Sequence, residues 1–235
     1  MVEARRPYKS SKKRAPVRTY HHGNLRDALV AASVELLAEE GFSGLTLRSA
    51  ARRVGVSHAA PKNHFGDLRG LLVAVAADGF QRLSMALATA YRDASHLGAA
   101  KALLAVGPAY VAFALAAPGH FRAMFHPSLA DRTASGALDS ASRETFALLV
   151  GAMRAAREEG SVREVDVVEA SLSAWSVVHG LATLAVDDQL RRKGLGADPR
   201  VLAEVVVGHL FEGLRAGPEA AEPPRTSRKS RRIPG

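Results

Sequence analysis

Apolar residues recur every three or four positions along most of this chain, which is the spacing of amphipathic helices. The first stripe covers residues 25–37 and is followed by Gly41, a residue suited to the left-handed position after a helix. No run of alternating β-branched residues is present, so the pattern predicts an all-α protein. Later helices, separated by glycine or proline residues, are predicted from Asp67 onward and at 99–117, 118–126, 137–159, 165–190 and 199–215.

Two short helices are predicted between the first stripe and the helix that starts at Asp67. One begins after Thr46 and reaches Gly55, and the other runs from Ser57 to about Phe65, with both hydroxyl residues expected as N-caps. Two short helices joined through a glycine turn form a helix-turn-helix, whose second helix can enter the DNA major groove. This stretch therefore predicts a DNA-reading element.

The side chains of this element divide into inner and outer groups. Ala50 and Ala51 let the two helices approach closely, while Val56 and Phe65 tie the second helix to the core. Ser57 would offer its hydroxyl and free backbone N–H groups to a phosphate. Arg and Asn suit base edges and Lys suits phosphate, but a plain helical bundle with a solvated polar face remains the alternative. The residues left outside are Arg48, His58, Ala59, Lys62, Asn63 and His64.

The net charge of +9 lies at the two ends of the chain. Residues 1–22 hold seven cations against one carboxylate, and residues 217–235 hold five against two, whereas residues 23–216 are balanced. Segments 1–19 and 217–235 are rich in Lys, Arg, Ser and Pro and are predicted to be disordered basic arms. Such arms attract polyanions, with nucleic acid ahead of anionic membranes. Two solvated, solubilising tails are the alternative.

Several classes of function are excluded or unsupported by the sequence. The absence of cysteine excludes disulfides, thiolate zinc sites and cysteine nucleophiles. His120, His126 and Asp131 are spaced poorly for a metal, and no catalytic or phosphate-binding motif is present. We therefore expect no catalytic residue, no metal site, no cofactor and no enzyme activity.

One uncharged stretch, residues 102–121, has the length of a membrane span. It contains two glycines and two prolines and is rich in alanine, which favours a buried helix of a soluble, cytoplasmic protein. No apolar signal segment follows the basic N-terminus, which supports the same expectation.

The motifs resemble those of the tetracycline-repressor (TetR) family of bacterial transcriptional regulators. The resemblance over about residues 20–85 is carried by Tyr20-His21-His22-Gly23-Asn24-Leu25-Arg26, Gly41-Phe42, Leu45-Thr46-Leu47-Arg48, Ala51, Val54-Gly55-Val56-Ser57, Pro61, His64-Phe65 and Asp67-Leu68-Arg69-Gly70-Leu71-Leu72. Farther on, the order Trp175-Ser176-Val177-Val178-His179-Gly180 resembles the Trp-His-Gly signature of one subgroup.

The resemblance implies a three-helix DNA-binding domain at 20–66 and a larger helical domain for ligand binding and dimerisation at 67–216. Family members pair through their last two helices and bind inverted-repeat operators, usually as repressors. This chain has Lys62 where the family commonly has Tyr, and Asn63 where it often has Tyr, Arg or Trp. The residues implied to face DNA are Thr46, Arg48, Ser57, His58, Ala59, Lys62, Asn63 and His64.

If the larger domain binds a small molecule, apolar and aromatic side chains should line a cavity between its helices. Each candidate has plain core packing as its alternative. The helices at 165–190 and 199–215 carry apolar or small faces that would meet a second copy, unless they pack within one chain. The candidates for the cavity are Tyr110, Phe113, Phe121, Met124, Phe125, Phe146, Met153 and Trp175, with His179 as a polar group.

These observations together predict a homodimeric, ligand-responsive regulator of transcription, with double-stranded operator DNA and an unidentified small molecule as partners. It would act as a repressor that the small molecule releases from its operator. The basic arm would add sequence-independent attraction to phosphates. Two alternatives stay open, namely an architectural DNA binder without an operator and a soluble helical enzyme or carrier of small molecules.

Overall fold

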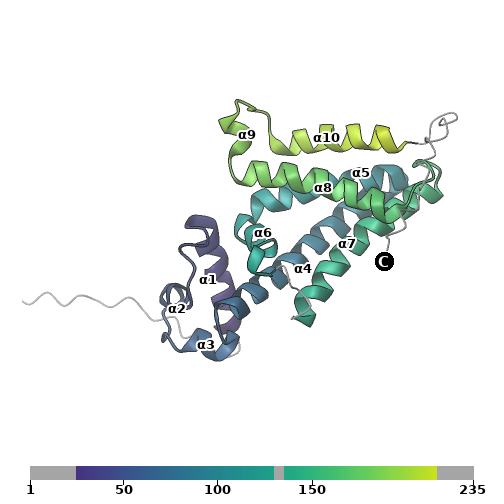
Figure 1. Ribbon diagram of the computed structural model, residues 1–235. Helices are drawn as coiled ribbons and strands as arrows, with labels where there is room; N and C mark the ends of the chain where they lie inside the picture. The colour runs from purple at the N-terminus through teal and green to yellow at the C-terminus, as the bar shows by residue number, and fades with distance from the viewer. Residues whose placement is uncertain (1–24, 130–134, 216–235) are drawn as a thin grey trace, which may run out of the picture.

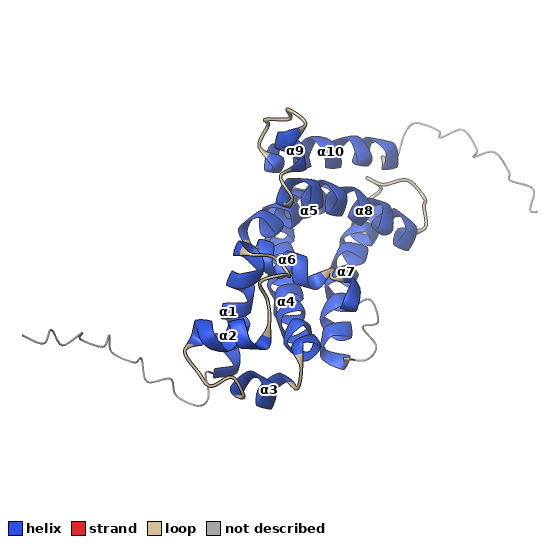
Figure 2. Ribbon diagram, turned by 60° about the vertical axis from the view of Figure 1, so that its left-hand side comes forward, coloured by secondary structure: helices blue, strands red, loops and turns tan. Residues whose placement is uncertain are grey.

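The computed structural model describes residues 25–129 and 135–215. Within these ranges every secondary-structure element is a helix (Figure 2). The described residues also contain one isolated β-bridge, between Val162 and Arg215, which does not form a strand. The predicted all-α class is therefore confirmed. The predicted basic arms at 1–19 and 217–235 lie outside the described residues.

Three short helices form the N-terminal domain at one end of the molecule (Figure 1). They are α1 (Leu25–Glu39), α2 (Leu47–Val54) and α3 (Ala60–Phe65). Ala50 and Ala51 of α2 are completely buried, so α2 lies close against its neighbours. Val56 and Phe65 are half-buried and pack on the core, as predicted.

The ends of α2 follow the predicted chemistry. The Thr46 hydroxyl oxygen accepts a 2.9 Å hydrogen bond from the Ser49 backbone N–H, and the Thr46 N–H donates to the Ser49 hydroxyl at 2.8 Å. Gly55 ends the helix with a φ of 80°, a left-handed conformation that glycine adopts without steric cost. The turn that orients the third helix is therefore encoded locally.

The start of α3 differs from the prediction, because the helix begins at Ala60 and Ser57 is not its N-cap. A helix starting at Ser57 would need the backbone N–H of residue 61 to donate to the Ser57 carbonyl. Pro61 has no N–H, so that carbonyl accepts instead from the Ala60 N–H at 3.0 Å, in a turn. Pro61 itself lies in the first turn of α3, where a missing N–H costs little.

The remaining helices form the larger C-terminal domain. They are α4 (Leu68–Ala94), α5 (Ala99–Ala116), α6 (Pro118–Met124), α7 (Gly136–Glu158), α8 (Val167–Val186), α9 (Gln189–Arg192) and α10 (Pro199–Leu214), with short 3-10 turns η1 (Ser95–Leu97) and η2 (Pro127–Leu129). The helix predicted at 165–190 is therefore two helices. The chain breaks at Asp188, which takes a left-handed conformation (φ 59°) that Asp tolerates better than most residues.

The long helix α4 runs diagonally from the N-terminal domain into the C-terminal domain, where it packs against α5, α6 and α7 (Figure 1). Helix α5 lies against α4, α8 and α10. Residues 68–97, α5 and α8 are long and apolar enough to cross a membrane by length and composition. In this fold, α4 packs on α5 and α5 on α8, so they share one helical core. The predicted buried segment 102–121 divides into parts of α5 and α6.

The short helix α6 joins the two domains. At Gly119 a Cβ atom would collide with the backbone carbonyl of Val34 on α1, so α6 and α1 touch backbone to backbone. The Arg122 guanidinium donates to the carbonyl oxygens of Leu37 on α1 (3.3 Å) and Val186 on α8 (3.4 Å). One seven-residue helix therefore links the N-terminal domain to the C-terminal helices.

His120, also on α6, is buried beside α4. Its Nε2 lies 2.8 Å from Asp78 Oδ2, and its Nδ1 is buried without a hydrogen-bond partner among the described residues. Burial lowers the pKa of His120, although the hydrogen bond to Asp78 acts in the opposite direction. The folded protein therefore favours the neutral imidazole.

Acidification is expected to destabilise the protein through this group. The unfolded chain takes up a proton at the ordinary histidine pKa of about 6.5, and the folded chain takes it up only at lower pH. The stabilisation is complete above that value and is lost as the pH falls below it. Urea unfolding between pH 8 and pH 5 should show this decline, and His120→Gln should reduce its slope.

The glutamine variant keeps an N–H near Asp78 but does not titrate. Burial also lowers the pKa of His179, so part of the slope should persist in the variant. A variant slope equal to that of the unaltered protein would show that His120 does not contribute.

Candidate DNA-binding and ligand-binding sites

The helix-turn-helix presents its polar side chains to solvent. The eight residues predicted to face DNA are all exposed, namely Thr46, Arg48, Ser57, His58, Ala59, Lys62, Asn63 and His64. The hydroxyl of Thr46 is nevertheless occupied in the cap of α2, and Ser57 lies in the turn before α3. The other exposed side chains of this element lie on α2, in the turn before α3 and on α3.

This element carries cations and no carboxylate. Residues 46–66 include three arginines and one lysine, while the four acidic residues of the described N-terminal domain lie on or just after α1. Arg53 is held by three of them, since its guanidinium lies 2.7 Å from Glu39, 3.2 Å from Glu35 and 3.9 Å from Glu40. The contact with Arg53 lowers the pKa of the Glu39 carboxyl. The positive charge of Arg53 therefore faces α1, and those of Arg48, Arg52 and Lys62 stay at the surface.

Arg52 is a further candidate for DNA contact that was not predicted from the sequence. It is exposed on α2, one helical turn after Arg48, so the two guanidinium groups share one face of the helix. The spacing of four residues could have identified it. Arg26 of α1 makes a cation–π contact with Phe65, whose ring centre lies 5.5 Å from the guanidinium carbon. This contact helps to hold α3 against α1.

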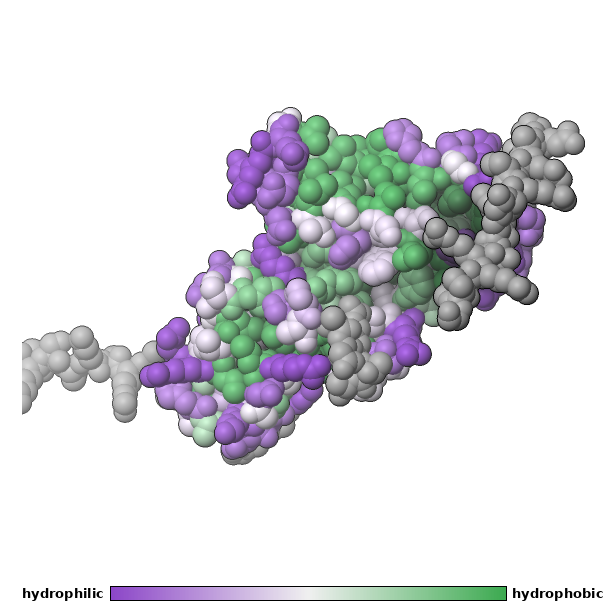
Figure 3. Space-filling model, in the orientation of Figure 1, coloured by the Kyte–Doolittle hydropathy of each residue, from purple (hydrophilic) through white to green (hydrophobic). Residues whose placement is uncertain are grey.

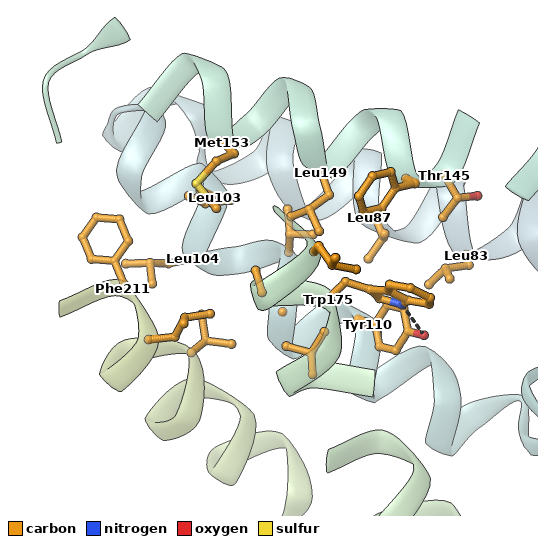
Figure 4. A pocket seen from close by; sticks show the side chains of 18 of the residues that line it. Leu83, Leu87, Leu103, Leu104, Tyr110, Thr145, Leu149, Met153, Trp175 and Phe211 are labelled. Carbon is orange, nitrogen blue, oxygen red and sulfur yellow. Dashed lines mark hydrogen bonds between the residues drawn. The ribbon is translucent and has the colours of Figure 1, made fainter. Parts of the chain in front are cut away.

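A cavity of about 370 Å³ lies in the C-terminal domain between α4, α5, α7, α8 and α10 (Figure 4). Its volume falls within the range of small-molecule sites. Five of the predicted candidates line it, namely Tyr110, Phe125, Phe146, Met153 and Trp175.

The four other predicted candidates do not line this cavity. Phe113 is half-buried and packs against the main core. Met124 is fully buried, and its side chain fills the space that Gly79 leaves on α4. His179 and Phe121 line a separate hollow of about 210 Å³ beside α6. Helical spacing identifies an apolar face but not the element that covers it.

The sequence analysis also missed much of the cavity wall. The side of α10 with Val207, Leu210, Phe211 and Leu214 closes the cavity, which agrees with the alternative that part of this helix packs within one chain. Phe80, Leu83 and Leu87 of α4 line it as well. No local signal separates these residues from ordinary core positions.

Three polar side chains form a hydrogen-bonded chain at the cavity wall. The Trp175 indole N–H lies 3.4 Å from the Tyr110 hydroxyl, which lies 2.9 Å from His179 Nδ1. Burial lowers the pKa of His179, which favours the neutral ring, and a neutral ring with its hydrogen on Nε2 accepts a hydrogen bond from the tyrosine hydroxyl at Nδ1. The His179 ring lies 4.4 Å from that of Phe125, which follows α6 directly. The cavity wall is therefore in contact with the helix that joins the domains.

An apolar surface covers the outside of α8 and α10 (Figure 3). The large apolar side chains exposed on these helices are Val168, Leu172, Leu184, Val201 and Val205, with Leu195 on the segment before α10, and Leu172 also lines the cavity. We call these six residues the α8–α10 face. Among the described residues, no group of three or more His, Cys, Asp or Glu side chains could hold a metal ion.

Comparison with known proteins gives two matches to regulator families. Residues 29–75 match the bacterial regulatory proteins of the tetR family, and residues 103–210 match the tetracyclin repressor-like C-terminal domain. The uncharacterized HTH-type transcriptional regulator YobS of Bacillus subtilis (strain 168) is 23% identical over 171 residues, which cover 73% of this chain and 84% of that protein.

Solved structures share the fold. A protein of unknown function from Rhodococcus sp. RHA1 is 35% identical, with a TM-score of 0.72 over 84% of this chain and 99% of that one. The transcriptional regulator FadR of Bacillus subtilis, in complex with stearoyl-CoA, is 15% identical, with a TM-score of 0.66 over 80% of this chain and 99% of that one.

The fold, the cationic helix-turn-helix and these matches define a DNA-binding transcriptional regulator rather than an enzyme. The chain belongs to the TetR family, with an N-terminal helix-turn-helix domain and a tetracyclin repressor-like C-terminal domain. The finer assignment to the Trp-His-Gly subgroup stays a prediction.

Proposed function

We propose that this protein is a homodimeric repressor whose hold on an inverted-repeat operator is released by a small molecule. The proposal assigns DNA binding to residues 20–66 and ligand binding and dimerisation to residues 67–216. The observation that carries it is the α6 connection between an exposed cationic helix-turn-helix and an apolar cavity. A repressor of this kind works in the bacterial cytoplasm, on the nucleoid.

DNA reading would rest on two helices. Lys62, Asn63 and His64 are exposed on α3, the helix that enters the major groove in a helix-turn-helix. Asn suits the edge of adenine and Arg that of guanine, so Asn63 and Arg48 are the proposed base-reading residues. Arg52 and Lys62 would neutralise phosphates and thereby add affinity without sequence preference.

Dimerisation would bury the α8–α10 face. Helices α8 and α10 pack on each other and on α5, yet this face stays exposed within one chain. Apolar side chains gathered on one surface favour a protein partner. A second copy is the simplest partner, because an inverted repeat presents two half-sites and needs two reading heads.

The effector would occupy the cavity and act through α6. A bound molecule contacts Phe125 and Trp175, and Phe125 adjoins the helix that carries Gly119 and Arg122. The complex of Bacillus subtilis FadR with stearoyl-CoA supports ligand binding in a protein of this fold. The effector can weaken operator binding only as far as it prefers the conformation that does not fit DNA.

Substitution of the reading residues tests the DNA-binding part of the proposal. Asn63→Ala and Arg48→Ala are each expected to reduce the preference for the native upstream fragment over a shuffled one by about 5- to 150-fold, because each removes a bidentate contact worth about 1–3 kcal/mol. Gel-shift titration of both fragments at two salt concentrations measures this preference. Arg52→Ala should instead weaken binding to both fragments equally.

Arg154→Ala is the matched control, since it removes an exposed arginine from α7 in the other domain. Unchanged preference in Asn63→Ala and Arg48→Ala would remove these residues from base reading. Equal, salt-sensitive binding of the unaltered protein to both fragments would favour the architectural alternative.

A further inference from the structure

We propose that the cavity selects a neutral molecule with a long, unbranched hydrocarbon chain. This inference rests on the proposed function only in taking the cavity as the effector site. It is carried by three properties of the wall, namely the pairing of its polar groups, the position of its charge and its shape.

Three polar side chains of the wall, those of Tyr110, Thr145 and Trp175, already have protein partners. The Trp175 N–H, the Tyr110 hydroxyl and His179 Nδ1 satisfy one another. The Thr145 hydroxyl lies 2.8 Å from the Ala141 carbonyl and 3.2 Å from that of Phe80. A polar group on a ligand would therefore give up its water without receiving an equivalent hydrogen bond from these residues. The wall selects against polar ligands for this reason.

The charge of the wall lies at its rim. Arg143 is the charged residue among the described residues that line the cavity, and its side chain is 75% exposed. It pairs with Asp139 at 2.9 Å, and Glu144 follows it on the same helix. The Asp139 carboxylate offsets the guanidinium, whereas Glu144 accepts a hydrogen bond from the Ser140 hydroxyl at 2.6 Å, so an anionic head group gains little beside Arg143. Neutral ligands are favoured over acids.

The shape of the cavity is elongated. Along α7 the wall extends from Ser142 to Met153, which is roughly 16 Å at the rise of an α-helix. Figure 4 shows Thr145 and Met153 at opposite ends, with Leu149 between them. A cavity of about 370 Å³ that follows α7 over this length suits an extended hydrocarbon chain.

The chain supplies its own reporter of occupancy, because Trp175 is the one tryptophan in the sequence and lies in the wall. The experiment titrates its fluorescence with n-alkanols of six to twelve carbons, using full-length protein without DNA, and repeats the titrations by calorimetry. Each added methylene should tighten binding about fourfold until the cavity is filled, as expected for burial of hydrocarbon.

Two further probes test neutrality and polarity. The diol of the same length should bind about 30-fold more weakly, since its second hydroxyl finds no partner in the wall. The carboxylate of the same length should bind no more tightly than the alkanol. Affinity independent of chain length, stronger binding of the diol or the carboxylate, or no binding by either method would overturn the proposal.

A matched pair of substitutions locates the site. Leu104→Phe adds volume at a residue that lines the cavity and should weaken binding of the longest alkanol at least about tenfold. Leu97→Phe makes the same change at an exposed position outside the cavity and should have no effect. Equal effects of the two variants would contradict the assignment, with thermal unfolding used to confirm that both are folded.

The ligand-binding experiments and the DNA-binding experiments can fail independently of each other. Operator binding without alkanol binding would leave the regulator in place and remove the hydrocarbon ligand. Alkanol binding that leaves the gel shift unchanged would keep the ligand class and remove the effector role. Each measurement therefore addresses one of the two proposals.

Discussion

A protein with glutamate at both Leu184 and Val205 is expected to be a monomer that binds the operator about 10²- to 10⁴-fold more weakly than the unaltered protein. The two residues lie on α8 and α10 and are 42% and 47% exposed, so the substitutions leave the interior of one chain intact. In a dimer they would place uncompensated charge in an apolar interface, where charge is costly. Loss of the second reading head then removes the gain from simultaneous binding of two half-sites.

Light scattering measures the mass of this variant, and gel-shift titration measures its operator affinity. The control is a double variant with glutamate at Met85 and Leu97, which are exposed apolar residues outside the α8–α10 face. It carries the same added charge and should remain dimeric with unchanged affinity. A dimeric Leu184→Glu, Val205→Glu protein, or one with full affinity, would move the dimer interface to another surface.

Gly119→Ala is expected to lower the free energy of unfolding by about 2–3 kcal/mol, although alanine is the better helix former. The added methyl group would meet the carbonyl of Val34, which belongs to the backbone of α1 and cannot rotate away. Relief requires α1 to move from α6, which also shifts the helix-turn-helix relative to the cavity. Urea unfolding measures the loss of stability, and gel-shift titration should show reduced operator affinity.

Gly151→Ala supplies a control of opposite sign. Gly151 is exposed on α7, and a Cβ atom there meets nothing within 4 Å. The same substitution should therefore raise stability by about 0.5–1 kcal/mol, the ordinary difference between the two residues in a helix. Gly119→Ala with a similar gain would show that α1 and α6 separate without cost.

Much of the DNA-binding element followed from local sequence. The capping residues of α2, the glycine turn and the buried alanines were predicted, because each depends on neighbours within a few positions. The predicted start of α3 at Ser57 is wrong, because the missing N–H of Pro61 prevents the first helical hydrogen bond to the Ser57 carbonyl. The position of Pro61 in the sequence is enough to predict the later start.

The cavity was harder to predict, since Phe113 and Met124 share the apolar, helical context of Tyr110 and Phe125 yet pack in the core. The whole contribution of α10 was missed for the same reason. Helical periodicity shows that a side chain lies on an apolar face, but it does not identify the facing helix.

The sequence alone determined the helical class, the caps and turn of α2, and the placement of cations on the helix-turn-helix, because these depend on residue type and short-range spacing. The tertiary fold decided which apolar faces became core, cavity wall or exposed α8–α10 face, and it brought Gly119 and Arg122 against α1. These outcomes depend on contacts between segments up to 85 positions apart. Such contacts form only when helices pack, and packing selects among faces that the sequence makes equally apolar.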